Sequence, residues 1–263
     1  MAMNLFDLTG KVVLVTGGNS GLGLGYARGI AKAGGDVVIW GRNSARNEQA
    51  VGELQQYGGR VVAQQVDTSD EAQVIAGIRD VVAQMGRLDC VFANAGIPGQ
   101  AASILELKTA EYLDLIAVSQ HGVFYTLREA ARHMVARAEA GDPGGSLVAT
   151  GSLSMYLGLP GAEHYAAAKA ATGAVVRGMA AEFGKYGIRA NLIAPGYIKT
   201  GIQRDWDSNQ TLSVDAMFAE RTPIPRVGEI EDFEGIAVYL ASDQSRFHSG
   251  DTIVIDGGYL IGL

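Results

Sequence analysis

The sequence predicts an α/β fold, in which a doubly wound parallel sheet of seven strands is covered by helices on both faces. Short apolar runs alternate with longer amphipathic stretches along the 263 residues, which is the pattern of a parallel sheet with crossover helices. Glycine-rich and polar motifs follow the ends of several apolar runs, where ligands bind in such sheets. With 48% hydrophobic residues, residues 1–263 are expected to bury one core as a single domain.

The elements follow from these runs in order. A buried strand precedes a helix that begins near Ser20, and six further apolar runs repeat the strand pattern. The expected strands lie near 11–16, 36–40, 61–66, 88–93, 146–151, 188–193 and 252–255. A long irregular segment at about 198–226 separates the sixth strand from the last helix, and loops of that length are usually functional.

The first strand-to-helix turn carries glycines at 17, 21 and 23. A Cβ there would keep a pyrophosphate away from the backbone, while the N–H groups and dipole at the helix start favour negative charge. Because the glycines follow a strand and open a helix, the turn predicts a dinucleotide site.

A second motif predicts catalysis. Tyr165 and Lys169 are four residues apart in an Ala-rich stretch, so a helix would place both side chains on one face. A nearby cation favours the phenolate, so Lys169 is expected to bring Tyr165 closer to acid-base chemistry. Ser152 ends an apolar run and could bond the same substrate oxygen.

These motifs resemble those of the classical short-chain dehydrogenase/reductases over nearly the whole chain. The T-G-x-x-x-G-x-G motif stands as Thr16, Gly17, Gly18, Asn19, Ser20, Gly21, Leu22 and Gly23. N-A-G stands as Asn94, Ala95 and Gly96, the catalytic motif as Ser152, Tyr165 and Lys169, P-G-x-x-x-T as Pro195, Gly196, Tyr197, Ile198, Lys199 and Thr200, and D-G-G as Asp256, Gly257 and Gly258.

The resemblance implies a Rossmann-type fold and hydride transfer between a nicotinamide and a secondary alcohol or ketone. It implies Tyr165 as general acid/base, Ser152 polarising the carbonyl and Lys169 holding the ribose. It also makes residues 198–226 a substrate-binding flap. The residues expected to bind the cofactor are Gly17, Asn19, Ser20, Gly21, Leu22, Gly23, Arg42, Asp67, Thr68, Asn94, Ala95, Gly96, Tyr165, Lys169, Pro195, Gly196, Ile198 and Thr200.

One position departs from the family pattern. Relatives carry an asparagine three residues before the glycine of the helix that follows N-A-G, and Ser119 stands there. In relatives this asparagine is thought to hold a water in a proton relay, and a hydroxyl is shorter with fewer bonding groups. Either Ser119, or the neighbouring His121, supports an altered relay, or turnover is weakened; we expect a working enzyme.

The end of the second strand favours NADP(H) over NAD(H). NAD-selective enzymes commonly place a carboxylate there, and Gly41 occupies its place. Arg42 follows and suits a bidentate phosphate contact, although it could stack on the adenine without selecting a cofactor. Asp67 and Thr68 match the place where relatives meet the adenine ring, although an Asp that caps the next helix would look the same.

The substrate is expected to be a small alcohol or carbonyl compound of unspecified class. The candidate walls are apolar, without an evident charged clamp, and comprise Ile97, Leu153, Met155, Tyr156, Leu159, Tyr197, Trp206, Met217 and Phe218. The apolar C-terminal segment Tyr259–Leu263 would be costly to leave in water, and relatives bury this tail between subunits, which favours a homotetramer.

Charge and cysteine content limit the function classes. The net charge of −7 disfavours nucleic acid and anionic membrane as partners. Cys90 is the only cysteine, so no internal disulfide can form, and no signal-peptide core or apolar run of spanning length is present. We expect a cytoplasmic protein without a metal site.

Rival functions remain on the same fold. A non-catalytic dinucleotide sensor is disfavoured by the intact catalytic residues and mildly favoured by Ser119. A 3-oxoacyl thioester reductase fits the motifs. An enoyl reductase usually spaces its tyrosine and lysine more widely, and a sugar epimerase has a different glycine spacing, so both fit worse.

Overall fold

The computed structural model describes residues 5–99, 101–200 and 214–262. Its centre is a seven-stranded sheet with the order β3-β2-β1-β4-β5-β6-β7, and every neighbouring pair is parallel. The strands are β1 (Val12–Thr16), β2 (Asp36–Trp40), β3 (Val61–Gln64), β4 (Cys90–Ala93), β5 (Gly145–Thr150), β6 (Ile188–Pro195) and β7 (Thr252–Ile255). The predicted fold class is confirmed.

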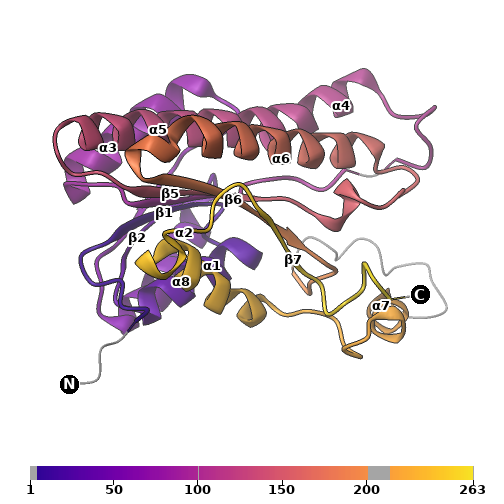
Figure 1. Cartoon of the computed structure of the whole chain (residues 1–263). Coiled ribbons are helices and arrows are strands. Elements are labelled where there is room, and N and C mark those ends of the chain that lie inside the picture. The colour runs from indigo at the N-terminus through magenta and orange to yellow at the C-terminus, as the bar shows by residue number, and fades with distance from the viewer. Residues whose placement is uncertain (1–4, 100, 201–213, 263) are drawn as a thin grey trace.

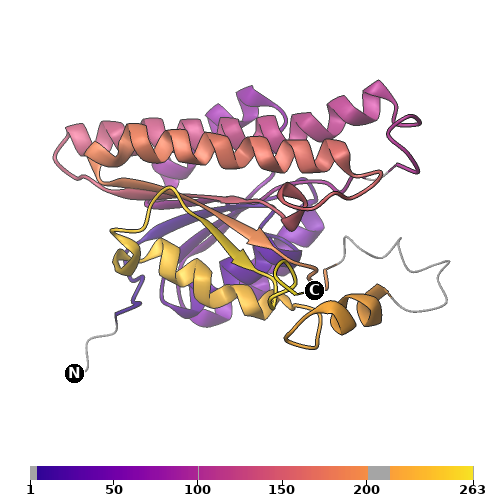
Figure 2. The same cartoon turned by 45° about the vertical axis from the view of Figure 1, so that its right-hand side comes forward.

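Helices cover both faces of this sheet (Figure 1). One layer contains α3 (Glu71–Met85), α5 (Gly122–Glu139) and α6 (Glu163–Phe183), with α4 (Thr109–Ile116) at its end. The other contains α1 (Gly21–Lys32), α2 (Ser44–Leu54) and α8 (Glu234–Ala241). The helix α7 (Val214–Arg221) lies beyond the sheet, on the side toward which β7 points (Figure 2).

The core lies in two layers, one on each side of the sheet, because successive strand residues point to opposite faces. Val12 and Leu14 of β1 belong to the cluster under α3, α5 and α6, whereas Val13 and Val15 belong to the cluster under α1, α2 and α8. Burial on both faces explains why the strands read as continuous apolar runs.

Three predicted strand boundaries differ from the structure by two residues. β3 ends at Gln64, which pairs with the last residue of β2, so 65–66 leave the ladder. β4 begins only at Cys90, and β6 continues to Pro195 because β7 offers Ile255 as its partner. The single domain over 1–263 stays a prediction, and residues 201–213 of the predicted flap lie outside the described residues.

Candidate active site

Hydrogen bonds join the carboxyl ends of β1, β4 and β5. Thr16 Oγ1 accepts from the backbone N–H groups of Asn94 (3.0 Å) and Ala95 (2.9 Å). Asn94 Nδ2 donates to the Thr16 carbonyl (3.1 Å), and Thr150 Oγ1 donates to Asn94 Oδ1 (3.1 Å). These bonds lie where the strand order reverses between β1 and β4, which is the expected ligand crevice of such a sheet.

The glycine-rich turn beside this junction fits a dinucleotide phosphate. Gly17 and Gly21 have φ angles of 65° and 53°, in the left-handed region that favours glycine. A Cβ on Gly23 would overlap the Gly17 carbonyl, so the turn can close only around glycine. Ser20 is the N-cap of α1 but makes no side-chain cap bond, and the first turn of that helix contains no acidic residue. Its N–H groups are therefore available to an anion.

The segment after β6 approaches the same turn. A Cβ placed on Gly21 would lie 3.6 Å from the Thr200 side chain, so this side chain lies close to the start of α1. Pro195 ends β6, and Gly196 packs so closely on Asp256 that a Cβ would come within 2.8 Å of the Asp256 Cα atom. Ile198 is buried and forms a β-bridge with Gly228. The predicted residues 195–200 therefore follow a fixed path past the glycine-rich turn.

The three catalytic candidates come together as the sequence predicts. Ser152 follows β5, and its side chain hydrogen-bonds the Tyr165 hydroxyl. Tyr165 and Lys169 lie on α6, with Lys169 Nζ 5.7 Å from the centre of the Tyr165 ring. Lys169 is 3% exposed and donates from Nζ to the Thr150 carbonyl (2.8 Å). The hydroxyl, phenol and ammonium groups therefore share one site.

Burial controls the electrostatics of this group. It raises the pKa of Tyr165 above its usual value, and the hydrogen bond from Ser152 opposes this rise only in part. Burial also lowers the pKa of Lys169 to about 8. The expected lowering of the Tyr165 pKa by Lys169 is therefore not found, because burial of the phenol is the largest influence on this pKa. The phenol stays protonated, which is the form that donates a proton.

Ser119 borders the same space as Lys169. It is fully buried in a π-helical segment, Ala117–His121, which joins α4 to α5. Its Oγ accepts from the Ile97 N–H (3.2 Å) and donates to the Ile97 carbonyl (3.4 Å). A Cβ on Gly96 would lie 3.4 Å from Lys169 Nζ and 3.5 Å from Ser119 Oγ, so both polar groups border the same point. The short serine thus reaches a donor and an acceptor.

His121 does not share this environment. Its side chain is exposed, and its ring lies 6.1 Å from the Tyr125 ring. The alternative in which His121 replaces part of a proton relay therefore has no geometric support, and of the two residues only Ser119 borders the same space as Lys169.

The residues predicted to contact the adenosine lie close together, after the ends of β2 and β3. The Arg42 side chain is 63% exposed, and its Nη1 lies 4.0 Å from Asp67 Oδ2. Asp67 also accepts from the Ser69 N–H (3.0 Å) and hydroxyl (2.7 Å), while Asp70 rather than Asp67 caps α3. Thr68 is 6% exposed and packs against Gly122 of α5. Arg42 is therefore more accessible than Asp67 and Thr68.

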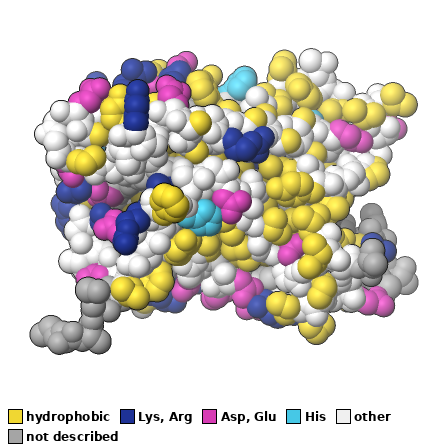
Figure 3. All heavy atoms as spheres, in the orientation of Figure 1, with side chains coloured by type: hydrophobic (Ala, Val, Ile, Leu, Met, Phe, Trp, Pro, Cys, Tyr) yellow, Lys and Arg dark blue, Asp and Glu magenta, His cyan; other side chains and the backbone are white. Residues whose placement is uncertain are grey.

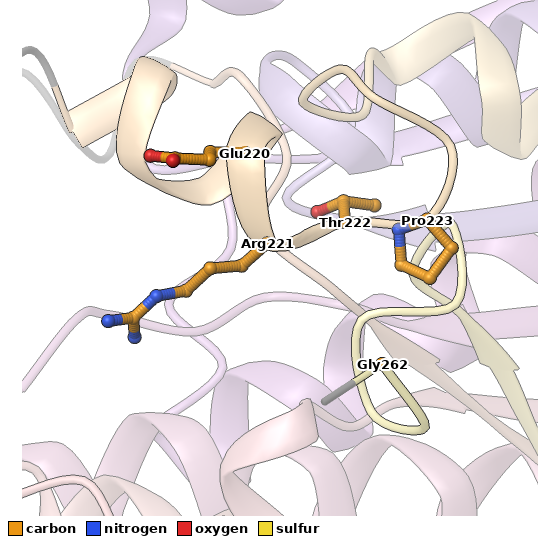
Figure 4. Close-up of a pocket in the computed structure, with 5 residues that line it drawn as sticks. All are labelled: Glu220, Arg221, Thr222, Pro223 and Gly262. Atoms are coloured by element: carbon orange, nitrogen blue, oxygen red, sulfur yellow. The ribbon is translucent and has the colours of Figure 1, made fainter.

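The described part of the flap carries an aromatic stack. The Tyr197 ring lies flat on the Phe218 ring at 4.1 Å, and the Tyr197 hydroxyl donates to Asp215 Oδ1 (3.1 Å). Below α7, Glu220, Arg221, Thr222, Pro223 and Gly262 line a pocket of about 530 Å³ (Figure 4). Figure 4 shows the Arg221 side chain extending away from α7 and from Gly262.

The candidate substrate walls lie in different environments. Met155 is partly buried and packs against the core cluster, and Leu153 is 5% exposed. Tyr156, Leu159 and Met217 are exposed, whereas Ile97 packs beside Tyr165. Trp206 lies outside the described residues.

Comparison of the sequence with known proteins identifies the family of this chain. Residues 17–260 match the family model described as enoyl-(acyl carrier protein) reductase. The chain is 33% identical to a gluconate 5-dehydrogenase of Gluconobacter oxydans over 99% of this chain and 98% of that protein. It is 33% identical to a 5-keto-D-gluconate 5-reductase of Escherichia coli over 99% of each chain. The chain belongs to the short-chain dehydrogenase/reductase family. It is an oxidoreductase that acts on CH–OH groups.

A solved structure extends the comparison to the fold. A gluconate 5-dehydrogenase from Burkholderia cenocepacia in complex with NADP and tartrate is 33% identical, covers 100% of both chains and gives a TM-score of 0.91. Short-chain dehydrogenase/reductases with this fold therefore include a protein that binds NADP.

Sequence reasoning missed two residues of the site. The Thr150 carbonyl, which accepts from Lys169, is a backbone group that no side-chain motif indicates. Asn47 is 4% exposed and lies on the buried face of α2 with Ala50 and Leu54. An asparagine in phase with apolar residues at helical spacing was the available signal.

Among the described residues, no helix has the length and apolar character needed to cross a membrane, and no three acidic, histidine or cysteine side chains gather as metal ligands.

Replacing Lys169 by methionine should stabilise the protein. The folded-state pKa of Lys169 is lowered to about 8, so burial of its charge costs stability fully below that pH, and the cost is relieved as pH rises toward the unfolded value of 10.5. Methionine removes this cost but also loses the hydrogen bond to the Thr150 carbonyl. The net effect of Lys169→Met should be a rise of about 2 kcal/mol in the free energy of unfolding at pH 7.

This gain is measured by denaturant unfolding at several pH values. The difference in unfolding free energy between the variant and wild type should narrow between pH 8 and 10. The control is Lys185→Met, which removes an exposed lysine and should leave stability unchanged. A Lys169→Met variant less stable than wild type at pH 7 would show that Lys169 is better accommodated than its burial indicates.

Replacing Ser119 by asparagine should destabilise the protein without raising turnover. The larger amide must enter a fully buried site in which the hydroxyl already bonds Ile97, so overpacking should cost about 1–3 kcal/mol. His121→Ala, at an exposed position, should leave turnover within about twofold of wild type. Melting temperatures and kcat of both variants test this, and a faster, equally stable Ser119→Asn would contradict it.

Proposed function

We propose that this chain transfers a hydride between NADP(H) and the carbon of a secondary alcohol or ketone, with Tyr165 as general acid/base. The observation that carries this proposal is the meeting of Ser152, Tyr165 and Lys169 beside the glycine-rich turn. A sensor would need the turn alone, whereas these three groups have a role only toward a reacting oxygen.

The chain's own residues divide the chemistry of reduction between them. NADPH, when bound, supplies the hydride to the carbonyl carbon. The Tyr165 hydroxyl gives its proton to the carbonyl oxygen, and Ser152 donates a hydrogen bond to the same oxygen as negative charge develops there. Lys169, held by the Thr150 carbonyl, provides positive charge near the tyrosinate that remains. Ser119 lies beside Lys169 and is proposed to support proton return.

The proposed cofactor residues surround the turn and the end of β2. They comprise the residues named for this role above, with Arg42 as the group that binds the 2′-phosphate of NADP(H). Arg42 is accessible and is held only at 4.0 Å from Asp67, so it is available to a phosphate. The NADP in the related gluconate 5-dehydrogenase structure supports this choice.

The proposed substrate class is a small polyhydroxy acid or its keto form. Two relatives named above act on gluconate and 5-keto-gluconate by name. Arg221 is exposed at the pocket below α7 and has no ion pair among the described residues, so it is available to a carboxylate. A 3-oxoacyl thioester is the second candidate, because a 3-oxoacyl-[acyl-carrier-protein] reductase of Chlamydia pneumoniae is 32% identical over 95% of this chain.

Assembly and location are also proposed. We propose a homotetramer in the cytoplasm. Hydrophobic side chains gather around β7, between α6 and α7 (Figure 3), and Val254 and Ile261 are 37% and 84% exposed. Such apolar surface is costly to leave in water and favours a subunit interface. The only cysteine, Cys90, is buried and needs no oxidising compartment.

Tyr165→Phe tests the function directly. With NADPH, wild type should reduce ketones in a panel that contains 5-keto-gluconate, a neutral ketose and an acetoacetyl thioester, followed at the cofactor's absorbance. The variant keeps the ring but loses the proton donor, so kcat should fall by at least about 10²-fold while cofactor affinity hardly changes. Near-normal turnover in Tyr165→Phe would sink the mechanism.

Arg42→Ala tests the cofactor choice. Only NADPH loses a charge-assisted contact, of about 1.5–3 kcal/mol, so KM for NADPH should rise far more than KM for NADH. If both cofactors weaken equally, Arg42 stacks on the adenine and selects nothing.

A further inference from the structure

Asn47 is a buried polar residue in an otherwise apolar stripe. It lies on the face of α2 that contains Ala50 and Leu54, and it is only 4% exposed. The other two members of the stripe belong to the core cluster between α2 and the sheet. Because burying an amide is costly unless its groups are bonded, the contacts of Asn47 show what it holds in place.

Those contacts fix the orientation of two amides. Asn47 Nδ2 donates to the carbonyls of Gly41 (3.0 Å) and Gln64 (3.5 Å), so its Oδ1 must face the other way. There Oδ1 accepts from Asn19 Nδ2 (2.7 Å), and the Asn19 side chain must therefore present its NH₂ group. One N–H of Asn19 is used by Asn47, and its second remains for another acceptor.

The two amides fill the space above Gly41. A Cβ on Gly41 would lie 2.5 Å from Asn47 Oδ1 and still closer to Asn19 Nδ2. A carboxylate at position 41, of the kind that binds ribose hydroxyls in NAD-selective enzymes, therefore has no room unless Asn19 moves. A neutral amide from the glycine-rich turn, with a free N–H donor, stands where the negative charge would be.

We propose that Asn47 is a positioning residue for cofactor selection: it holds the Asn19 amide over Gly41 so that an N–H group, rather than a carboxylate, faces the 2′-position of the adenosine ribose. This inference rests on the proposed use of NADP(H). An N–H donor stabilises a 2′-phosphate, whereas a carboxylate would repel it. Asn47 acts through Asn19 and does not itself reach the cofactor.

The alternative is that Asn47 only bonds the Gly41 carbonyl and so secures α2 against the sheet. The two roles differ in what they change. A structural role affects stability and the binding of both cofactors together, whereas a positioning role changes the ratio of their affinities.

The test measures dissociation constants by calorimetry for NADP⁺, NAD⁺, adenosine 2′,5′-bisphosphate and AMP. The variants are Asn47→Leu, Asn19→Ala and their double mutant. Asn47→Leu has similar volume but cannot accept from Asn19. Leu54→Val is the control, because it weakens the packing of the same stripe away from Gly41 and should lower the melting temperature without changing any affinity ratio.

The expected result is a rise of about tenfold in the Kd of NADP⁺ and of the bisphosphate for Asn47→Leu, with NAD⁺ and AMP changed less than about twofold. Asn19→Ala should match it, and the double mutant should show no further loss, because the two residues act as one unit.

Two results would overturn the inference. If Asn47→Leu weakens all four ligands equally or leaves the ratios unchanged, Asn47 is structural, although a wild-type preference for the bisphosphate would preserve the proposed cofactor. If wild type itself binds the bisphosphate no more tightly than AMP, the NADP(H) assignment and this inference both fail.

Discussion

The hydrogen bonds of Thr16 and Asn94 hold the site together. They bind the ends of β1 and β4, where the strand order of the sheet reverses. Thr150 extends the same set of bonds to β5, and its carbonyl receives the Lys169 ammonium. The glycine-rich turn, the segment after β4 and helix α6 are thus linked through one group of mutually bonded residues.

That arrangement costs stability at the residues that we propose to be catalytic. Lys169 is buried with a backbone carbonyl as its bonded partner, and the pKa of Lys169 falls to about 8 because burial penalises its charge. The same burial raises the pKa of Tyr165 and keeps the phenol protonated. A site that favours one protonation state of each group is characteristic of acid-base catalysis, and enzymes commonly lose stability at such positions.

The sequence predicts the fold class and the meeting of the motif residues because both follow from short-range patterns. The apolar runs indicate strands buried on both faces, and the four-residue spacing of Tyr165 and Lys169 indicates a shared helix face. Strand ends were less predictable, since β6 reaches Pro195 only because β7 pairs with it.

Properties that depend on packing between distant segments could not be predicted. Met155 lies near Ser152 in sequence but packs against the core cluster, and the pKa of Tyr165 rises because surrounding segments remove water from it. Gly41 shows the same limit. Its missing carboxylate is visible in the sequence, but the two amides that fill the space come from the glycine-rich turn and from α2.

The central claim is that these residues support direct hydride transfer to a carbonyl carbon. The most direct measurement uses NADPH deuterated at the transferring C4 position with a ketone that the wild-type enzyme reduces, and locates the label by mass spectrometry and NMR. The account predicts one deuterium on the carbinol carbon of the product, with the hydroxyl proton drawn from solvent. A product without deuterium on that carbon, or cofactor that binds without any transfer to a carbonyl compound, would contradict it.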